Sequence, residues 1–275
     1  MNKKYTIEEI EFLRTNYPKY GACYCSKILN RPAYCLYPVV KRYKIQQRTG
    51  KYLSKHPSMM NININQFLTI DKMETAYFLG FLWADGNIIS YKSNKINHHR
   101  ISLEINSKDM NDILPYINKL GKWCIQNRVR KDWKPVSSIS TNNKELFNFL
   151  KNNDYNIKSS TTPTKILNTI PDNLKMYFWR GYFDGDGCIT KKTKYNSFKF
   201  SGTYQQDWTD IQSLLKELNI INKLYRIIEK TGNKYSCVMI QNKDGVKKLI
   251  NYFNPINNSI GLKRKTERMI KIINS

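Results

Sequence analysis

The chain has 275 residues, 40% of them hydrophobic, which is enough to bury a core without help from disulfides. Lys and Arg outnumber Asp and Glu by 46 to 21, a formal net charge of +25 that favours a polyanionic partner over a merely solvated basic surface. No apolar run of about 18 residues is present and the first residues lack an apolar segment, so we expect neither a membrane-spanning helix nor a signal peptide, and no membrane partner.

The cysteines and the amino-acid usage bear on localisation. The six cysteines are scattered and form no C-x-x-C pair, which predicts free thiols in a reducing, intracellular compartment. Heavy use of Asn, Lys and Ile is what A/T-rich codons encode, and it indicates a phage, viral or organellar genome.

Residues 1–50 are predicted to form a small helical module. Thr6 is a candidate N-cap with Glu9 three residues later, the spacing of a capping box. Two breaks, at residues 17–21 and 30–32, divide this region into three short helices, and the last of them is basic. Three short helices with a tight turn and a basic last helix resemble a helix-turn-helix DNA-binding module, although a helical cap without ligand contact fits the same pattern.

Residues 51–70 are predicted to be a linker, because they are polar and lack helical periodicity. Within this segment, residues 61–65 alternate Asn and Ile. They could form an edge strand or an extended arm lying along DNA.

From residue 71 the chain becomes regular, and residues 71–160 form a first repeat of helical and strand patterns. The apolar periodicity predicts, in order, helix 75–84, strands 86–91 and 100–106, helix 108–120, strands 125–133 and 136–141, and helix 144–150. Residues 161–275 follow the same order, with helix 175–185, strands 187–193 and 197–204, a helix capped by Asp207 or Thr209, strands 223–229 and 235–240, and a helix containing Val246, Leu249 and Ile250.

The two halves align residue by residue. Adding 101 to the numbers of one helical stripe, Met110, Ile113, Leu114 and Ile117, gives the stripe Ile211, Leu214, Leu215 and Leu218. This agreement predicts a tandem duplication. The expected fold class is therefore α+β, with two α-β-β-α-β-β-α repeats and a basic C-terminal segment.

Each repeat opens with an apolar helix that ends at an acid followed by glycine. The acids are Asp85 and Asp186, which lie 101 residues apart. The carboxyl end of a helix is negative, so a carboxylate there is unfavourable. A single acid-glycine ending could equally be a simple helix stop. The same unfavourable carboxylate at the helix end of both repeats indicates a functional site.

Small residues sit four positions apart in both helices, Gly80 with Ala84 and Gly181 with Gly185. Residues at this spacing share one helical face, so the two helix backbones can approach closely and bring the two acids together. Adjacent carboxylates repel one another and raise a pKa unless a counter-charge is present. Oxygen ligands of this kind suit Mg²⁺, and paired metal sites serve phosphodiester hydrolysis, which matches a polyanionic substrate.

Residues 78–86 and 179–187 resemble the LAGLIDADG motif of the homing endonucleases, and the resemblance extends over about residues 71–270. The sixth motif position is Trp83 in the first copy and Asp184 in the second; we interpret Asp184 as structural. The eighth position, the metal-binding acid of the family, is intact as Asp85 and Asp186.

The resemblance implies a single-chain pseudo-dimer whose two antiparallel sheets form a saddle over the major groove of double-stranded DNA. It also implies two or three Mg²⁺ sites shared between Asp85 and Asp186, with the backbone carbonyls of Ala84 and Gly185 completing the coordination. The family often has a basic residue near the active site, for which Lys243 is the candidate. Strand and C-terminal positions of the kind that contact DNA are Arg100, Arg128, Arg130, Lys131, Lys191, Lys194, Lys199, Arg226, Lys263 and Arg264.

The sequence therefore predicts a site-specific, Mg²⁺-dependent double-strand DNA endonuclease that spreads its own coding element, acting as a monomer. The alternative is a non-catalytic protein on the same scaffold, either an RNA maturase or a DNA-binding regulator. Degenerate acids would favour that alternative, and both acids are present. An intein is disfavoured, because no flanking splicing blocks are visible.

Overall fold

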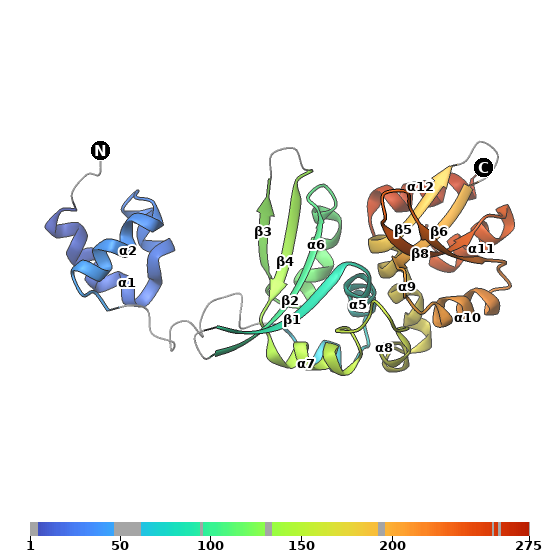
Figure 1. The fold of residues 1–275 in the computed structure, drawn as a ribbon, viewed down its shortest axis with the longest axis horizontal. Coiled ribbons are helices and arrows are strands. Elements are labelled where there is room, and N and C mark those ends of the chain that lie inside the picture. The colour runs from blue at the N-terminus through green and yellow to red at the C-terminus, as the bar shows by residue number, and fades with distance from the viewer. Residues whose placement is uncertain are drawn as a thin grey trace. The chain divides into compact units, whose positions relative to one another are not determined.

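The computed structural model describes residues 5–46, 62–93, 96–129, 134–191, 196–254, 256–257 and 260–274. The chain divides into two compact units, one ending at Met60 and the other beginning at Asn61 (Figure 1). Among the described residues, no helix combines the length and the apolar character needed to cross a membrane.

The first unit consists of α1 (Ile7–Ile28) and α2 (Ala33–Arg42). Its start is the predicted capping box, in which the Thr6 hydroxyl accepts from the Glu9 amide and the Glu9 carboxylate accepts from the Thr6 amide. Gly21, with φ 77°, breaks the helical geometry inside α1, so the unit has the three helical segments that the sequence predicts. These segments bury a small core of their own, formed by Leu13, Tyr17, Cys25, Leu36, Val39, Val40 and Ile45.

The second unit begins earlier than predicted. Ile62 forms a β-bridge with Gly121, and Phe67 and Ile70 are buried in the core of this unit. The prediction of a linker is therefore wrong for residues 62–70, because their few apolar side chains cover the first repeat. The rest of the predicted linker, up to residue 61, lies outside the described residues.

The two repeats have the element order that the sequence predicts. After the short α4 (Asn65–Leu68), the first repeat contains α5 (Met73–Asp85), β1 (Gly86–Ser93), β2 (Ile96–Asn106), α6 (Met110–Lys119), β3 (Cys124–Arg128), β4 (Val136–Thr141) and α7 (Lys144–Asn152). The second contains α8 (Thr164–Thr169), α9 (Asp172–Asp186), β5 (Gly187–Lys191), β6 (Asn196–Thr203), α10 (Thr209–Glu217), β7 (Lys223–Ile228), β8 (Lys234–Ile240), α11 (Lys243–Phe253) and α12 (Lys263–Ile273). Helices α4, α8 and α12 were not predicted.

Each repeat folds its strands into a four-stranded antiparallel sheet, in the orders β1-β2-β4-β3 and β5-β6-β8-β7. The predicted α+β class and the duplicated architecture are thereby confirmed. One face of each sheet is apolar and buried, through side chains such as Leu103 and Ile139 in the first and Phe200 and Val238 in the second. Helices α5 and α9 lie side by side between the two sheets (Figure 1).

Candidate active site between the two repeats

The crossing of α5 and α9 depends on two glycines. A Cβ on Gly80 would lie 1.8 Å from the carbonyl oxygen of Phe178, and a Cβ on Gly181 would lie 2.0 Å from that of Tyr77. Both distances are far below a normal contact, so each helix presses its glycine against the backbone of the other. The two contacts are related by the 101-residue offset, which makes the interface nearly symmetric.

The same crossing brings the acidic ends together. A Cβ on Gly185 would lie 2.5 Å from the Ala84 Cβ and 3.0 Å from the Asp85 Oδ2, so the Asp85 carboxylate lies against α9. The predicted interface residues Gly80, Ala84, Gly181 and Gly185 thus all lie where the two helices meet. Asp85 and Asp186 are close enough for the charge of Asp186 to disfavour ionisation of Asp85.

The surroundings hold both carboxyl groups back from ionising. Asp85 is accessible to solvent, yet the protein packed around it, followed by the charge of Asp186, raises its pKa to about 6. Burial likewise raises the pKa of Asp186. The ammonium groups of Lys158 and Lys265 act in the opposite direction on both carboxyl groups. The site is therefore a repelling acid pair that two lysines only partly compensate.

Lys158 and Lys265 lie at the carboxyl ends of the two helices, and sequence reasoning missed both. The Lys158 Nζ donates to the carbonyl oxygens of Trp83 at 2.6 Å, Leu82 at 3.3 Å and Ala84. The Lys265 Nζ donates to those of Phe183 at 2.6 Å, Asp184 at 2.8 Å and Gly187 at 2.7 Å. Each ammonium thus satisfies the carbonyls that a helix end leaves unpaired.

Burial lowers the pKa of both lysines to about 8, against the opposing attraction of nearby carboxylates. The sequence holds one signal that could have identified them. The α-β-β-α-β-β-α pattern of each repeat ends in a helix, and each lysine follows that helix. Lys158 comes after α7 and Lys265 comes after α11. Lys158 lies in an irregular segment and Lys265 in a run of basic residues, so neither is conspicuous.

Asp184 is the centre of a buried network, which agrees with its interpretation as a structural residue. Its Oδ2 accepts from the Tyr77 hydroxyl at 2.9 Å, from the Leu262 amide at 2.8 Å and from the Arg180 Nε at 3.2 Å. Arg180 and Asp184 are both almost fully buried. Gly261, with φ +128°, leaves no room for a Cβ beside this pair. The network therefore fixes the segment that leads to Lys265.

In the first repeat, aromatic packing holds the segment that leads to the lysine. Trp83, the counterpart of Asp184, packs edge-on against Tyr155 with ring centroids 4.9 Å apart. The Tyr155 hydroxyl donates to the Leu79 carbonyl at 2.8 Å, and Tyr155 leads to Lys158. The residues at the sixth motif position, Trp83 and Asp184, therefore each anchor the segment that supplies the lysine of their own repeat.

Lys243 and Ala84 have other contacts than those expected. Lys243 begins α11 and lines a groove with Ile221 and Asn242, and no interaction of its side chain with either acid is found among the described residues. The Ala84 carbonyl accepts from Lys158, so the Gly185 carbonyl is the better placed of the two as a cation ligand. The basic groups next to the acids are Lys158 and Lys265.

The donor set fits a hard divalent cation. Asp85 and Asp186 offer carboxylate oxygens whose mutual repulsion a cation would relieve. No cluster of three or more His, Cys, Asp or Glu residues is found in the described part of the chain. A site with so few protein ligands suits Mg²⁺, which retains water and binds phosphate oxygens.

The strand registers divide the predicted DNA-binding residues between two faces. Arg100 and Arg128 alternate with the buried residues of the first sheet, and Lys199 does so in the second, so these three lie on the faces away from the core. Arg128 forms an ion pair with Glu104 on that face. Arg226 pairs with Ser236, in phase with the buried Val238, and so lies on the opposite face to Lys199.

The remaining predicted contacts fall elsewhere. Lys191 is the last strand position of β5, and its side chain lies outside the described residues, as do Arg130, Lys131 and Lys194. The Arg264 guanidinium is engaged with both Asp109 oxygens, at 3.0 and 2.9 Å, and is therefore not a free phosphate ligand. Lys263 is exposed at the start of α12.

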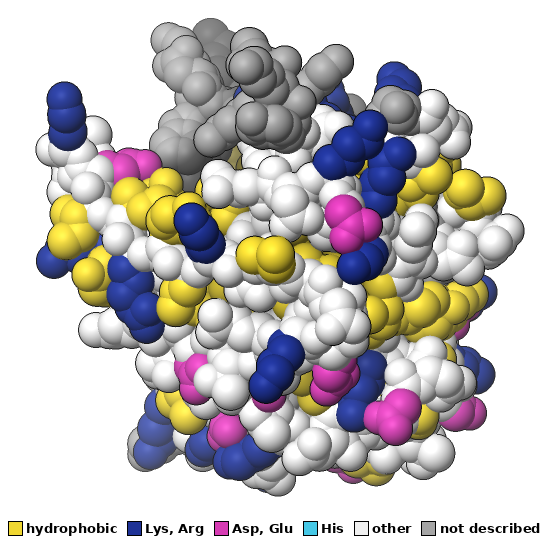
Figure 2. Space-filling view, turned by 90° about the vertical axis from the view of Figure 1, so that its right-hand side faces the viewer, with side chains coloured by type: hydrophobic (Ala, Val, Ile, Leu, Met, Phe, Trp, Pro, Cys, Tyr) yellow, Lys and Arg dark blue, Asp and Glu magenta, His cyan; other side chains and the backbone are white. Residues whose placement is uncertain are grey.

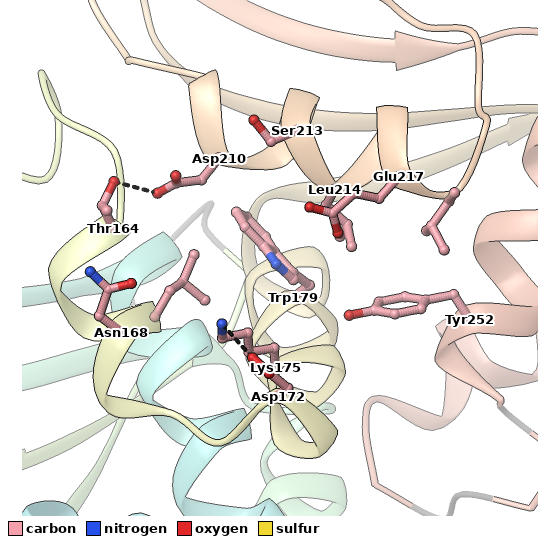
Figure 3. A pocket seen from close by; sticks show the side chains of 12 residues that line it. Thr164, Asn168, Asp172, Lys175, Trp179, Asp210, Ser213, Leu214, Glu217 and Tyr252 are labelled. Carbon is pink, nitrogen blue, oxygen red and sulfur yellow. Dashed lines mark hydrogen bonds and ion pairs between the residues drawn. The ribbon is translucent and has the colours of Figure 1, made fainter.

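Two other surfaces are poor candidates for a polyanion. On the face of the second repeat, Lys and Arg are interspersed with acidic and hydrophobic side chains rather than gathered in one patch (Figure 2). A pocket of about 510 Å³ lies between α8, α9 and α10, and its lining includes Asp172, Asp210 and Glu217 (Figure 3). Asp172 forms an ion pair with Lys175, and Asp210 accepts a hydrogen bond from Thr164. The pocket is therefore lined by acids that bond to other residues of its lining.

Comparison with known proteins confirms the resemblance. Residues 173–254 match the family model described as a LAGLIDADG-like domain. The structure of I-DmoI in complex with DNA and Ca is similar, with a TM-score of 0.51 and 16% identity over 72% of this chain and 97% of that chain. A structure of mesophilic variants of the homing endonuclease I-DmoI gives 0.52 and 17% over the same shares. No curated protein sequence matches the chain.

Proposed function

We propose that this chain, which has the fold of a LAGLIDADG homing endonuclease, is a site-specific endonuclease that hydrolyses both strands of DNA with Mg²⁺. The observation that carries the proposal is the meeting of Asp85 and Asp186 at the ends of two helices that cross in direct backbone contact. A fold does not fix a function, but a preserved acid pair at its centre supports hydrolysis rather than binding alone.

DNA is the polyanion that the net charge of +25 favours, and a single chain supplies both halves of the binding surface. The sheet faces away from the core carry polar and basic side chains at alternate positions, among them Arg100, Arg128 and Lys199. The major groove admits β-strands, so side chains on one face of such a sheet can reach base edges there. Lys199 lies over the Tyr235 ring at 5.6 Å, which orients its ammonium on this face.

The acids, the Gly185 carbonyl and the two lysines have separable roles. Asp85, Asp186 and the Gly185 carbonyl would hold Mg²⁺, which supplies polarisation of the phosphate and activation of water when bound. Lys158 and Lys265 favour the ionised form of both acids and hold the helix ends in place. Their positive charge beside the acid pair also favours a phosphate group there.

The test is cleavage of a library of randomised or genomic DNA with Mg²⁺, followed by mapping of the ends. Asp85→Asn and Asp186→Asn should each lower the cleavage rate about 10³-fold or more while DNA affinity stays within a few fold. Asp172→Asn is the matched control, since it makes the same charge change at the exposed start of α9 and should cut normally.

Cleavage by the Asp85→Asn/Asp186→Asn double variant would show that the acid pair is not the hydrolytic centre. Intron splicing that persists in that double variant would instead identify an RNA maturase. Sequence-specific DNA binding without cleavage by the unaltered protein would identify a regulator.

A further inference from the structure

We infer that the first unit is a second DNA-binding unit. It binds duplex DNA through the exposed face of α2, beside the site that the second unit cuts. The inference deepens the proposed function and rests on it for the position of the contact. The binding itself is argued from the first unit alone.

The unit has the element order of a helix, a short turn and a second helix. The second segment of α1 ends at the turn formed by residues 29–32, where Asn30 adopts φ 49° and Pro32 precedes α2. Arg31 in this turn donates to both Glu9 oxygens, at 2.8 and 2.9 Å, and stacks on the Tyr5 ring at 4.0 Å. This ion pair holds the turn against the first helical segment, and it therefore fixes the direction of α2.

Helix α2 has one buried and one exposed face. Leu36, Val39 and Val40 pack into the core of the unit. Tyr34 is 73% exposed and Tyr37 57% exposed, and both share a face with Lys41 at the i, i+3, i+7 spacing. Large exposed aromatic side chains grouped on one face of a ten-residue helix are typical of an interaction surface.

The charge of this face matches DNA. Lys41 and Arg42 in the last turn of α2, and Lys44 just after it, are exposed. Across residues 5–46 and the rest of the described chain, none of the ion pairs involves these three. Of the three acids of the unit, Glu9 binds Arg31 and Glu11 binds Arg14, while Glu8 lies in the first turn of α1.

A helix about 10–12 Å across fits the major groove, and a recognition helix contacts base edges with its N-terminal residues. On α2 these residues are Tyr34 and Tyr37, while the basic residues at its C-terminal end would contact phosphates. RNA is the less favoured partner, because a helix cannot read the narrow major groove of an RNA duplex.

The point where the chain enters the second unit predicts where the extra contact falls. Ile62 pairs with Gly121, just before β3, the edge strand of the first sheet. Residues 47–61 separate the two units, and a chain of that length reaches at most about 50 Å, or about 15 base pairs. A single unit on a tether of this length should therefore add one contact within about 15 base pairs of the site bound by the second unit.

The test uses the full chain with the three substitutions Tyr34→Ala, Tyr37→Ala and Lys41→Ala combined. Affinity for a duplex of unrelated sequence is measured by fluorescence anisotropy between about 50 and 200 mM salt. The triple variant should bind about tenfold more weakly, with a salt slope shallower by about one. Arg14→Ala removes the same charge from α1, where Glu11 already pairs with it, and should change the affinity less than about twofold.

Equal affinities of the triple variant and the unaltered protein would overturn the inference, as would a larger loss of affinity for structured RNA than for duplex DNA. This comparison needs no cleavage, so it is decided even if the proposed function fails. If the protein cuts DNA, hydroxyl-radical footprinting should show one additional protected stretch that the triple variant loses while protection at the cut positions remains. A footprint unchanged by the triple substitution would contradict the inference.

Discussion

At the scale of single residues, Asp85 shows how the protein keeps a carboxylate in an unfavourable state. The packed environment and Asp186 raise its pKa to about 6, and the two lysines only moderate this. Such a group binds protons more readily in the folded than in the unfolded chain. Its ionised form therefore lowers stability, a cost that is absent near pH 4 and fully present above about pH 6.

We predict that Asp85→Asn stabilises the protein at neutral pH in the presence of a chelator. After allowance for solvent screening, the gain is ~1 kcal/mol, or about 2–4 °C in Tm for a domain of this size. The gain should shrink as the pH is lowered through 6 towards 4, which thermal unfolding at a series of pH values checks. Asp172→Asn should behave oppositely, because Lys175 lowers the pKa of Asp172. An unchanged or lower Tm for Asp85→Asn at pH 7 would contradict the prediction.

The residue scale also shows the limits of reading the sequence. The two acids and the small residues were predictable, because a broken helix rule was repeated at a fixed offset. Lys158 and Lys265 were not, because neither falls on a repeated offset: Lys158 follows its acid by 73 residues and Lys265 by 79. Lys243 looked suitable by its position before a helix, but only the tertiary structure shows which lysines lie near the acids.

At the scale of elements, the contact between α5 and α9 leaves no room for a side chain at its two glycines. Gly80 and Gly181 each meet the backbone of the partner helix, so nothing flexible can move aside. The distance between the acids is set by this crossing, and a wider crossing would separate them.

We predict that Gly181→Ala destabilises the second unit by about 2–4 kcal/mol, although alanine favours helices by about 1 kcal/mol over glycine. The added Cβ would lie 2.0 Å from the Tyr77 carbonyl oxygen and would push the helices apart. Urea unfolding monitored by tryptophan fluorescence measures the change. Gly232→Ala is the control, since nothing lies within 4 Å of its Cβ position and only its φ of +85° opposes the change, at about 1–2 kcal/mol. Equal losses in the two variants would refute close packing as the cause.

Elements with strong periodicity were predicted well, and the others were not. Strand β4 was predicted at its observed bounds, 136–141, and α5, α7 and α9 within a few residues. Helix α8 has only six residues, too few for a periodic pattern. The charged side chains of α12 bond to other elements of the fold, as Arg264, Lys265 and Arg268 do. A sequence with so many charged residues resembles that of an exposed segment. Residues 62–70 contain isolated apolar residues whose burial depends on contacts distant in sequence.

At the scale of the whole molecule, α12 joins the two repeats at a second place. On the first repeat, its Lys263 amide donates to Asp112 at 2.9 Å and its Arg264 binds Asp109. On the second, Arg268 donates to the Ile189 carbonyl at 2.8 Å and Thr266 accepts from Arg180 at 2.6 Å. The C-terminal helix therefore holds the repeats together independently of the α5–α9 crossing.

We predict a coupling of ~1 kcal/mol between Asp109 and Arg264 in a double-mutant cycle of Asp109→Asn and Arg264→Ala. The pair is bidentate, but the Arg264 side chain is 58% exposed, so solvent weakens the interaction. Urea unfolding of the four proteins gives the coupling. The exposed pair of Lys248 and Asp244 on α11 is the control and should give no more than about 0.5 kcal/mol. Additive effects at Asp109 and Arg264 would mean that the pair does not hold α12 in place.

The hydrogen bond from Tyr77 to Asp184 has a consequence for ancestry. In a duplicated protein, each half descends from a chain that could pair with its own copy. The position equivalent to Tyr77 in the second repeat is Phe178, which has no hydroxyl. Two copies of the second repeat would therefore bury two aspartates that each lack one of three donors, at a cost of about 1.5–3 kcal/mol for each lost hydrogen bond to a charged group. The halves have diverged into obligate complements, and a separated second repeat should not regain a symmetric ancestral dimer.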